Sequence, residues 1–207
     1  MKAYKVPVKG YFEVNSYFWV DDETNHGFLI DPGAQGHELM QLCHENGWII
    51  EKILLTHGHF DHIGGIAAIR EETDIPVYIH EAGEAYLVDT HLNLSRYYHC
   101  DMTVHGAKHF RDRDVFRLES NPACSLRVIH TPGHTPDSVI FYDQRHDVAF
   151  VGDTIFKGSR GNDQYPGGNG VQLIRSIRQR VLTLPDQTVL LSGHSDETSV
   201  SAEKRYY

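Results

Sequence analysis

The sequence predicts an α/β protein in which two β-sheets pack face to face and helices cover the outside. Short strand patterns gather in two groups, one before residue 80 and one after residue 115, and each group is accompanied by helical patterns. Sheets and amphipathic helices bury their apolar faces by stacking in layers. The 207 residues show no repeat and no linker, so we expect a single domain over residues 1–207.

The first group begins with three strand patterns separated by polar turns: Tyr4–Val8, Asn15–Val20 and Gly27–Ile30. The turn Asp31-Pro32-Gly33 follows. Helix and strand patterns then alternate, in the order helix Gly36–Asn46, strand Glu51–Leu55, helix Ile63–Glu72, strand Pro76–Ile79 and helix Ala82–Asp89. Residues 90–114 have no clean period, and we expect an irregular loop there.

The second group is mostly strands, with a hairpin expected around Asp143–Asp147: Val115–Leu118, Leu126–Ile129, Val139–Tyr142 and Val148–Val151. A glycine-rich loop follows over Gly158–Gly170. One apolar face then predicts a helix ending at Pro185, through Val171, Ile174, Ile177, Val181 and Leu184. Thr188–Leu191 is the last expected strand.

Composition narrows the function classes. A net charge of −9 and the lack of a basic tract argue against a protein that binds nucleic acid or a membrane surface. Met1–Gly10 has no apolar run of secretory length, and no window approaches about 18 apolar residues. Three widely spaced cysteines are typical of reduced thiols. We therefore expect a cytoplasmic protein with a small-molecule substrate, with monomer and homodimer both open.

Potential metal ligands follow four apolar strand patterns. The first run is His57-Gly58-His59-Phe60-Asp61-His62, and the other three ligands each follow a glycine: His134, Asp153 and His194. Ligands at strand ends share one edge of a sheet, so distant segments can meet at one site. Imidazole and carboxylate without thiolate suit Zn²⁺, with Fe or Mn²⁺ as alternatives. The sequence predicts two divalent cations; the competing interpretation is a capped helix with solvent-facing histidines.

Other histidines have weaker contexts. His130 lies inside an apolar strand run, so we expect a packed residue rather than a ligand. Five more have no strand-end context and are expected mostly on the surface or in loops: His80, His91, His99, His105 and His109.

These motifs resemble the metallo-β-lactamase superfamily, and most closely its small glyoxalase II-like (hydroxyacylglutathione hydrolase-like) members. The matching segments span nearly the whole chain: Asn15-Ser16-Tyr17, Asp31-Pro32-Gly33, Thr56–His62, Thr131–Thr135, Gly152–Phe156, Pro166–Gly168 and Gly193-His194. The resemblance implies a four-layer αβ/βα sandwich of two mixed β-sheets. It also implies that His57, His59 and His134 hold one cation, that Asp61, His62 and His194 hold the other, and that Asp153 bridges them.

The resemblance is weaker in the parts that select the substrate. In the loop at residues 161–168, Asn162 and Gln164 stand where small relatives usually have arginine and aspartate, and Ser195-Asp196 replaces a common Gly-Pro. The chain stops at Tyr207 without the C-terminal helical extension that many hydroxyacylglutathione hydrolases carry. Lys157 and Arg160 are the candidate substrate-binding residues, although they could equally be solvated loop charges.

The expected activity is hydrolysis of a thioester such as S-lactoylglutathione by a hydroxide shared between the two cations. Asp61 is expected to act in catalysis as well as in metal binding. A thiolate leaves without a proton, whereas an amide nitrogen needs one, so a thioester is favoured over a β-lactam. The alternatives are a persulfide dioxygenase-like protein with one iron held by His57, His134 and Asp153, a lactonase or phosphodiesterase on the same scaffold, and a metal-binding module that has lost activity.

Overall fold

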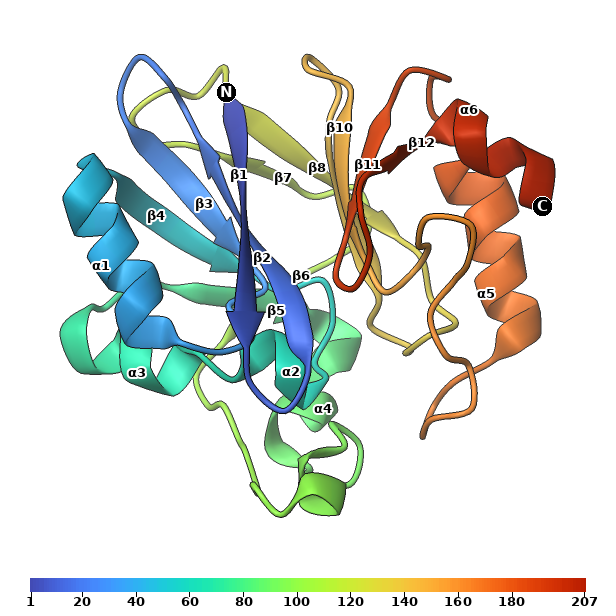
Figure 1. Ribbon diagram of the computed structural model, residues 1–207, viewed down its shortest axis with the longest axis horizontal. Helices are drawn as coiled ribbons and strands as arrows, with labels where there is room; N and C mark the ends of the chain where they lie inside the picture. Colours follow the sequence, from blue (N-terminus) through green and yellow to red (C-terminus); the bar gives the residue numbers. More distant parts are fainter.

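The computed structural model describes residues 1–207 and contains two six-stranded sheets that face each other (Figure 1). The first sheet has the order β1(Lys2–Lys9), β2(Glu13–Val20), β3(His26–Ile30), β4(Ile49–Leu54), β5(Val77–His80) and β6(Lys108–Phe110). The second has the order β12(Thr198–Ser199), β11(Val189–Ser192), β10(Val148–Gly152), β9(Val139–Asp143), β8(Ser125–His130) and β7(Val115–Arg117).

Both sheets are mixed, as predicted. In the first sheet the β1–β2 and β2–β3 pairs are antiparallel and the three remaining pairs are parallel. In the second only β10–β11 is parallel. Helices α1(Gly36–Asn46) and α3(Ile66–Glu72) cover the first sheet, and α5(Gly170–Ser176) and α6(Val200–Glu203) lie beside the second (Figure 1). This arrangement confirms the predicted sandwich.

Three hydrophobic clusters fill the spaces between the four layers. Strand alternation assigns side chains to them: Phe18 of β2 packs with α1 and α3, whereas Tyr17 and Trp19 point between the sheets. In β9, Phe141 lies between the sheets, and Ile140 packs in the outer cluster with residues of α5 and α6. The middle cluster therefore holds the two sheets together, and the outer clusters attach the helices.

The predicted helix over Ile63–Glu72 is divided in two. α2(Phe60–Ile63) and α3 are separated by Gly64-Gly65, where the chain passes very close to the turn at residues 32–34. A Cβ at Gly64 would lie 2.3 Å from the carbonyl oxygen of Gly33, so this crossing requires glycine.

Residues 90–114 are not wholly irregular, so that prediction was wrong in part. After α4(Glu84–Val88) and a 3₁₀ turn at Ser95–Tyr98, the short strand β6 extends the first sheet in parallel with β5. The elements beyond His194, namely β12, α6 and a 3₁₀ turn at Lys204–Tyr206, were not predicted either.

The helix after the glycine-rich loop begins at Gly170, where the side chain of Asn169 accepts a hydrogen bond from the amide of Gln172. Val171 in its first turn is 84% exposed, so its predicted place on the inward face was wrong. Leu173, Ile177 and Val181 form the buried face instead, and a π-helical turn at Ile177–Val181 continues the helix. None of the helices has the length and apolar character needed to cross a bilayer.

Candidate metal centre

Seven imidazole and carboxylate side chains meet at one edge of the two sheets. They are the seven predicted ligands, placed after β4 and in α2 (His57, His59, Asp61, His62), after β8 (His134), after β10 (Asp153) and after β11 (His194). They form three overlapping triads in which the ligand atoms lie within 4.8 Å of one another: His57–His59–His134, His57–His62–Asp153 and Asp61–His62–His194.

Asp153 lies between the two halves of the cluster. Its Oδ1 is 3.4 Å from Nε2 of His62, and its Oδ2 is 3.7 Å from Nε2 of His134 and 3.6 Å from Nε2 of His194. On one side Nδ1 of His59 lies 2.9 Å from Nε2 of His134. The Asp153 carboxylate thus faces both groups of nitrogens, as a bridging ligand must.

Four of the imidazole rings are held in place by hydrogen bonds at Nδ1, on the side of the ring away from the cluster. Nδ1–H of His134 donates to the backbone carbonyl of Asn162 at 2.7 Å, and Nδ1–H of His194 donates to that of Glu13 at 2.9 Å. His57 and His62 are held by side chains, as described below. When Nδ1 of a neutral imidazole carries the proton, the lone pair is on Nε2, which here faces the cluster.

Asp31 organises two of these rings and was not among the predicted site residues. Its Oδ2 accepts hydrogen bonds from Nδ1–H of His62 at 2.9 Å and from the hydroxyl of Thr56 at 2.6 Å. The Thr56 hydroxyl therefore accepts from Nδ1–H of His57, at 3.1 Å. Carboxylate partners of this kind orient metal-binding histidines and increase their basicity. Like the predicted ligands, Asp31 directly follows an apolar strand, but the Pro32-Gly33 pair after it predicted only a turn.

Burial and mutual charge shift the pKa values of the cluster strongly. Burial, reinforced by the neighbouring imidazoles, holds the pKa of His57 well below its usual value. Burial alone would raise the pKa of Asp153 and lower that of His62, but the opposite charges around each group, their own attraction first among them, outweigh burial and shift both pKa values the other way. The centre therefore keeps its carboxylates ionised while several imidazoles remain neutral.

The donor set fits divalent cations. Nε2 of His57, Nε2 of His62 and Oδ1 of Asp153 are buried and have no hydrogen-bond partner in the protein. Buried polar atoms without partners are costly, and coordination to a cation would satisfy these three. The backbone at Gly193 packs directly against the cluster and leaves no space for a side chain, because a Cβ there would lie 2.5 Å from Oδ1 of Asp153.

Asp137 is a second buried carboxylate that sequence reasoning missed. It is fully buried, and neither of its oxygens has a hydrogen-bond partner of good geometry. It lies behind the first ligand segment, where a Cβ at Gly58 would be 3.6 Å from Oδ2. Burial raises the pKa of Asp137 to about 6, and the nearby Thr135 hydroxyl and Gly58 amide offset only part of that effect.

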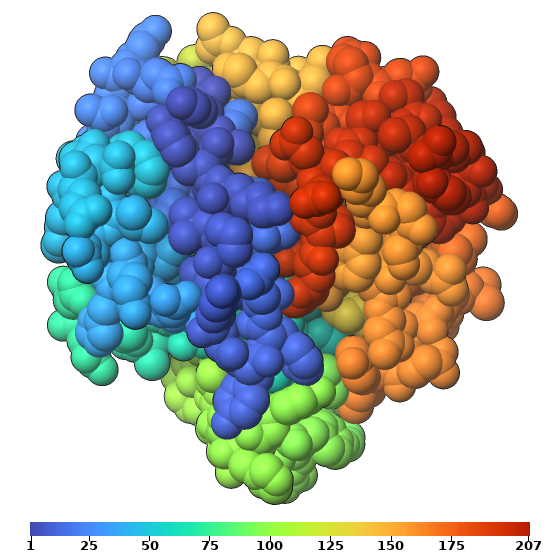
Figure 2. All heavy atoms as spheres, viewed as in Figure 1, coloured from blue at the N-terminus to red at the C-terminus, as the bar shows by residue number.

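A cleft of about 440 Å³ opens onto the cluster, and five ligands line it: His59, Asp61, His134, Asp153 and His194. Aromatic and apolar side chains form much of the remaining wall, including Phe12, Phe60 and Tyr165. Figure 2 shows the blue β1–β2 turn, the green segment around residue 98 and the orange loop before α5 gathered around this region.

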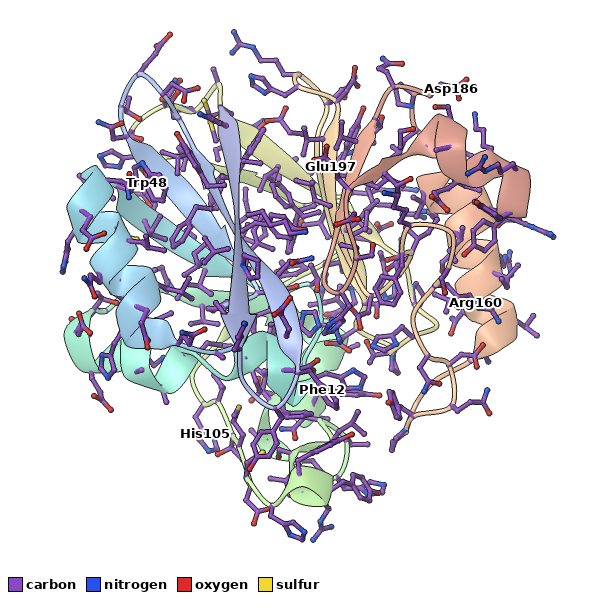
Figure 3. The ribbon with its side chains drawn as sticks, viewed as in Figure 1. Phe12, Trp48, His105, Arg160, Asp186 and Glu197 are labelled. Carbon is purple, nitrogen blue, oxygen red and sulfur yellow. The ribbon has the colours of Figure 1, made fainter.

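The structure does not bring the two predicted substrate-binding cations to the cleft. Lys157 pairs with Asp196 at 3.6 Å and Arg160 pairs with Asp163 at 3.4 Å, and neither side chain lines the cavity. Figure 3 places Arg160 in the loop beside α5 and Phe12 at the β1–β2 turn. Asn162 and Tyr165 are the residues of the glycine-rich loop that face the cleft.

The remaining histidines lie outside the cluster. His130 is packed, as predicted: its ring stacks on that of His80 with centroids 4.2 Å apart, and its Nε2–H donates to the carbonyl of Pro136 at 2.8 Å. His80 is buried rather than on the surface, which corrects its grouping with the exposed His91, His105 and His109.

The chain is similar to several known proteins. The family described as the metallo-beta-lactamase superfamily matches residues 10–194. The chain is 40% identical over 205 residues to the probable metallo-hydrolase YqgX of Bacillus subtilis, covering 99% of this chain and 95% of the relative. It is 29% identical over 203 residues to the hydroxyacylglutathione hydrolase GloC of Haemophilus influenzae, covering 97% and 93%.

Solved structures give the same result. The BLEG-1 B3 metallo-beta-lactamase has a TM-score of 0.91 at 33% identity, with 99% of this chain and 97% of that chain covered. TTHA1623 in a di-iron-bound form has a TM-score of 0.85 at 32% identity, covering 98% of each chain. ETHE1 from Myxococcus xanthus has a TM-score of 0.80 at 27% identity, covering 100% and 83%. The fold, the converging ligands and these matches together show that the chain belongs to the metallo-β-lactamase superfamily.

Proposed function

We propose that the protein is a dinuclear metal-dependent hydrolase that cleaves thioesters. The observation that carries this proposal is the set of three overlapping triads around Asp153, which supplies seven nitrogen and oxygen ligands and no thiolate. Such ligands suit Zn²⁺, Fe or Mn²⁺. We favour Zn²⁺, although the relative solved with two irons keeps iron as an alternative.

In this assignment His57, His59 and His134 would hold one cation, Asp61, His62 and His194 the other, and Asp153 both. Two cations bound in this way would lower the pKa of a water to about 7 and polarise a carbonyl oxygen in the cleft. The protein contributes rigid positioning, because the rings are fixed from behind by Thr56, Asp31, Asn162 and Glu13.

Asp61 is the residue we assign to proton transfer. Its Oδ2 lies 3.2 Å from Nε2 of His194, and its carboxylate lines the cleft. Burial would raise the pKa of Asp61, but His62 and His194 lower it below its usual value, so the group is ionised and can accept a proton from the attacking water.

The same electrostatics support a thioester as substrate. Asp61 and Asp153 both have lowered pKa values, so neither carboxyl holds a proton for a departing amine at the start of the reaction, and the proton available to one is the proton that Asp61 takes from the water. A thiolate, whose conjugate thiol has a pKa of about 8.5, leaves without that assistance. S-lactoylglutathione is the first thioester to test, because of the similarity to GloC.

The test combines metal analysis of the purified protein with release of thiol from S-lactoylglutathione and from simple acyl thioesters. We expect two cations per chain and hydrolysis that is lost on chelation. His194→Ala should lose the second cation and most activity, whereas His109→Ala, at an exposed site, should lose neither. Protein that holds two cations but cleaves no thioester would refute the proposed reaction.

A mononuclear iron oxidoreductase acting on persulfides is the second candidate. The observation in its favour is that His57, His134 and Asp153 by themselves provide two imidazoles and one carboxylate, a set that suits oxygen-activating iron. One iron per chain, with oxygen uptake on addition of glutathione persulfide, would replace the hydrolase proposal.

A further inference from the structure

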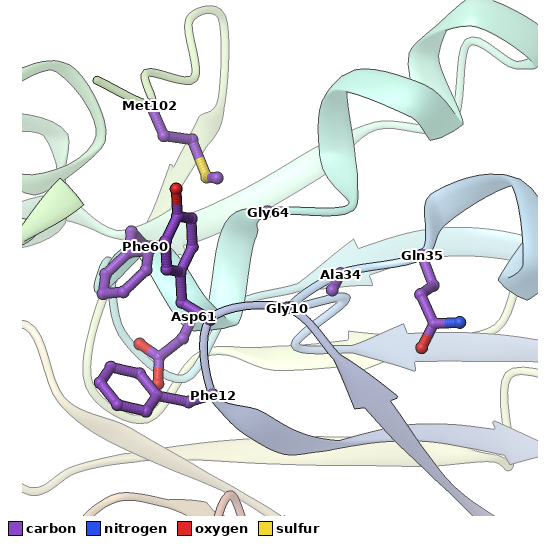
Figure 4. Close-up of a pocket in the computed structure, with 10 residues that line it drawn as sticks. Gly10, Phe12, Ala34, Gln35, Phe60, Asp61, Gly64 and Met102 are labelled. Carbon is purple, nitrogen blue, oxygen red and sulfur yellow. The ribbon is translucent and has the colours of Figure 1, made fainter. Parts of the chain in front are cut away.

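Three hollows adjoin the metal-facing cleft; one, which shares Glu13 and His194 with it, has no apolar residue in its wall, and the other two are lined mostly by apolar or aromatic side chains. One of these two, of about 320 Å³, shares Phe12, Phe60 and Asp61 with the cleft and is also lined by Tyr11 and Met102. Figure 4 shows Phe12, Phe60, Asp61 and Met102 around it. The other, of about 280 Å³, shares Leu94 and Tyr165 with the cleft and is lined by further tyrosines. A ligand held at the cluster can therefore extend into either hollow.

Four aromatic rings, Tyr11, Phe12, Phe60 and Tyr98, form what we call the aromatic rim between these spaces. Phe60 and Tyr98 are stacked with centroids 5.0 Å apart, and Phe12 meets Tyr98 edge to face at 5.1 Å. Tyr11 completes the group at 5.9 Å from Tyr98. Three separate segments thus supply one apolar surface next to the candidate catalytic groups.

Part of the aromatic rim is exposed, although Phe60 within it is buried. Tyr11 is 60% exposed and Phe12 is 41% exposed, although both are large and apolar. Exposed apolar patches beside a polar site are typical of ligand-binding grooves. Because the rim adjoins the cleft, part of a substrate held at the cluster is the occupant that this surface would meet.

The charged residues around these spaces favour an uncharged substrate over an anionic one. No lysine or arginine lines the cleft or either of the two apolar hollows, and the acidic Glu13 and Asp61 do. Lys5 lines the third, polar hollow, together with the acidic Glu13 and Asp196. Glutathione carries two carboxylates, and the cationic side chains near the cleft all have acidic neighbours: Lys5 shares its hollow with Glu13 and Asp196, and Lys157 and Arg160 are paired with Asp196 and Asp163. An uncharged chain meets no such mismatch.

We propose that the aromatic rim binds the acyl chain of the substrate, so that the preferred thioester carries an apolar acyl group of several carbons and the glutathione part contributes little. This inference rests on the proposed thioesterase function. The substrate class that fits this groove is thioesters with an apolar acyl chain.

The experiment measures kcat/KM for thioesters of one neutral thiol, N-acetylcysteamine, with straight acyl chains from acetyl to decanoyl. Burial of each methylene should increase kcat/KM about fourfold until the groove is filled. With the acyl group fixed as octanoyl, replacing the neutral thiol by glutathione should give no gain. A flat chain-length series, or a tenfold preference for the glutathione thioester, would overturn the proposal.

Variants test whether the aromatic rim is responsible. The double variant Tyr11→Ser with Tyr98→Ser should flatten the increase with chain length, and Tyr98→Phe should retain it. Tyr206→Ser is the matched control, because Tyr206 is an equally exposed tyrosine on the far C-terminal turn. An unchanged slope in a folded double variant would place the acyl chain elsewhere.

A binding measurement keeps the inference separate from the proposed reaction. S-methyl and S-octyl N-acetylcysteamine are thioethers that cannot be hydrolysed, and titration calorimetry on the metal-loaded protein reports their affinity. We expect at least a 100-fold tighter Kd for the octyl compound, and equal affinities would refute the groove. Strong octyl binding without hydrolysis of any thioester would instead refute the function and leave the groove in place.

Discussion

Replacing Asp137 with asparagine should stabilise the metal-free protein at neutral pH. The carboxylate is fully buried without a well-oriented donor, and its pKa is raised to about 6 by burial. Since the folded-state pKa exceeds the ordinary value of about 3.9, the folded state binds more protons than the unfolded state between about pH 4 and 6, and the free energy of unfolding falls as pH rises through that range. A difference of about two pKa units corresponds to about 3 kcal/mol.

The assay is urea denaturation of chelator-treated Asp137→Asn and unsubstituted protein at a series of pH values, because a bound cation would itself favour the carboxylate. At pH 7.5 the variant should be more stable by about 2–3 kcal/mol, which raises the urea midpoint by about 1 M. The difference should shrink below about pH 5 and vanish near pH 3, where the carboxyl is mostly protonated in both states.

Asp143→Asn is the control with the opposite sign. Asp143 is also buried, but its carboxylate accepts hydrogen bonds from Nε1 of Trp19 and from the amides of Arg145 and His146. Removing that charge should destabilise the protein by about 1–3 kcal/mol. The reasoning fails if Asp137→Asn is no more stable than the unsubstituted protein at pH 7.5, or if the difference is independent of pH.

Three further predictions concern the centre and its surroundings. Asp31→Asn should weaken metal binding about 10–100-fold, measured by chelator competition, because the ring of His62 loses its carboxylate partner. Gly193→Ala should abolish metal binding in a protein that still unfolds cooperatively, since the added Cβ would lie 2.5 Å from Oδ1 of Asp153; retained stoichiometry would contradict the geometry. Burial, together with the stacked imidazole of His130, lowers the pKa of His80 to about 4. The unsubstituted protein should therefore lose up to about 3 kcal/mol of stability as the pH falls from 6.5 to 4, and a His80→Phe variant should not. Denaturation curves at the two pH values measure this difference.

The fold was predictable where the apolar pattern matched the burial. The helix Gly36–Asn46 has its predicted bounds because Leu39, Met40 and Cys43 form one buried stripe and Gly47 ends it in a left-handed conformation. β6 was missed because only Phe110 of its three residues is buried, which leaves no alternation to read. Val171 was misplaced because the first turn of α5 extends past the core.

The candidate site was predictable because its ligands share one context, an apolar strand followed by a short turn. The two buried acids next to the ligands, Asp31 and Asp137, could not be predicted as part of the site. Asp31 is followed by a Pro-Gly pair that is equally typical of an ordinary turn, and Asp137 lies in a Pro-Asp-Ser stretch with no periodic pattern. Their burial arises from the packing of both sheets, which no single segment specifies.

Two imidazoles of the centre are held by main-chain oxygens, those of Glu13 and Asn162. The same two segments carry Phe12 and Tyr165, whose side chains line the cleft. A carbonyl oxygen is present whatever amino acid occupies its position, so a substitution in either loop can change the wall of the cleft while the two rings keep their hydrogen bonds. The side chains that face the cleft can thus diverge while the candidate metal ligands stay in place, so single substitutions in these two loops offer a route to new specificity.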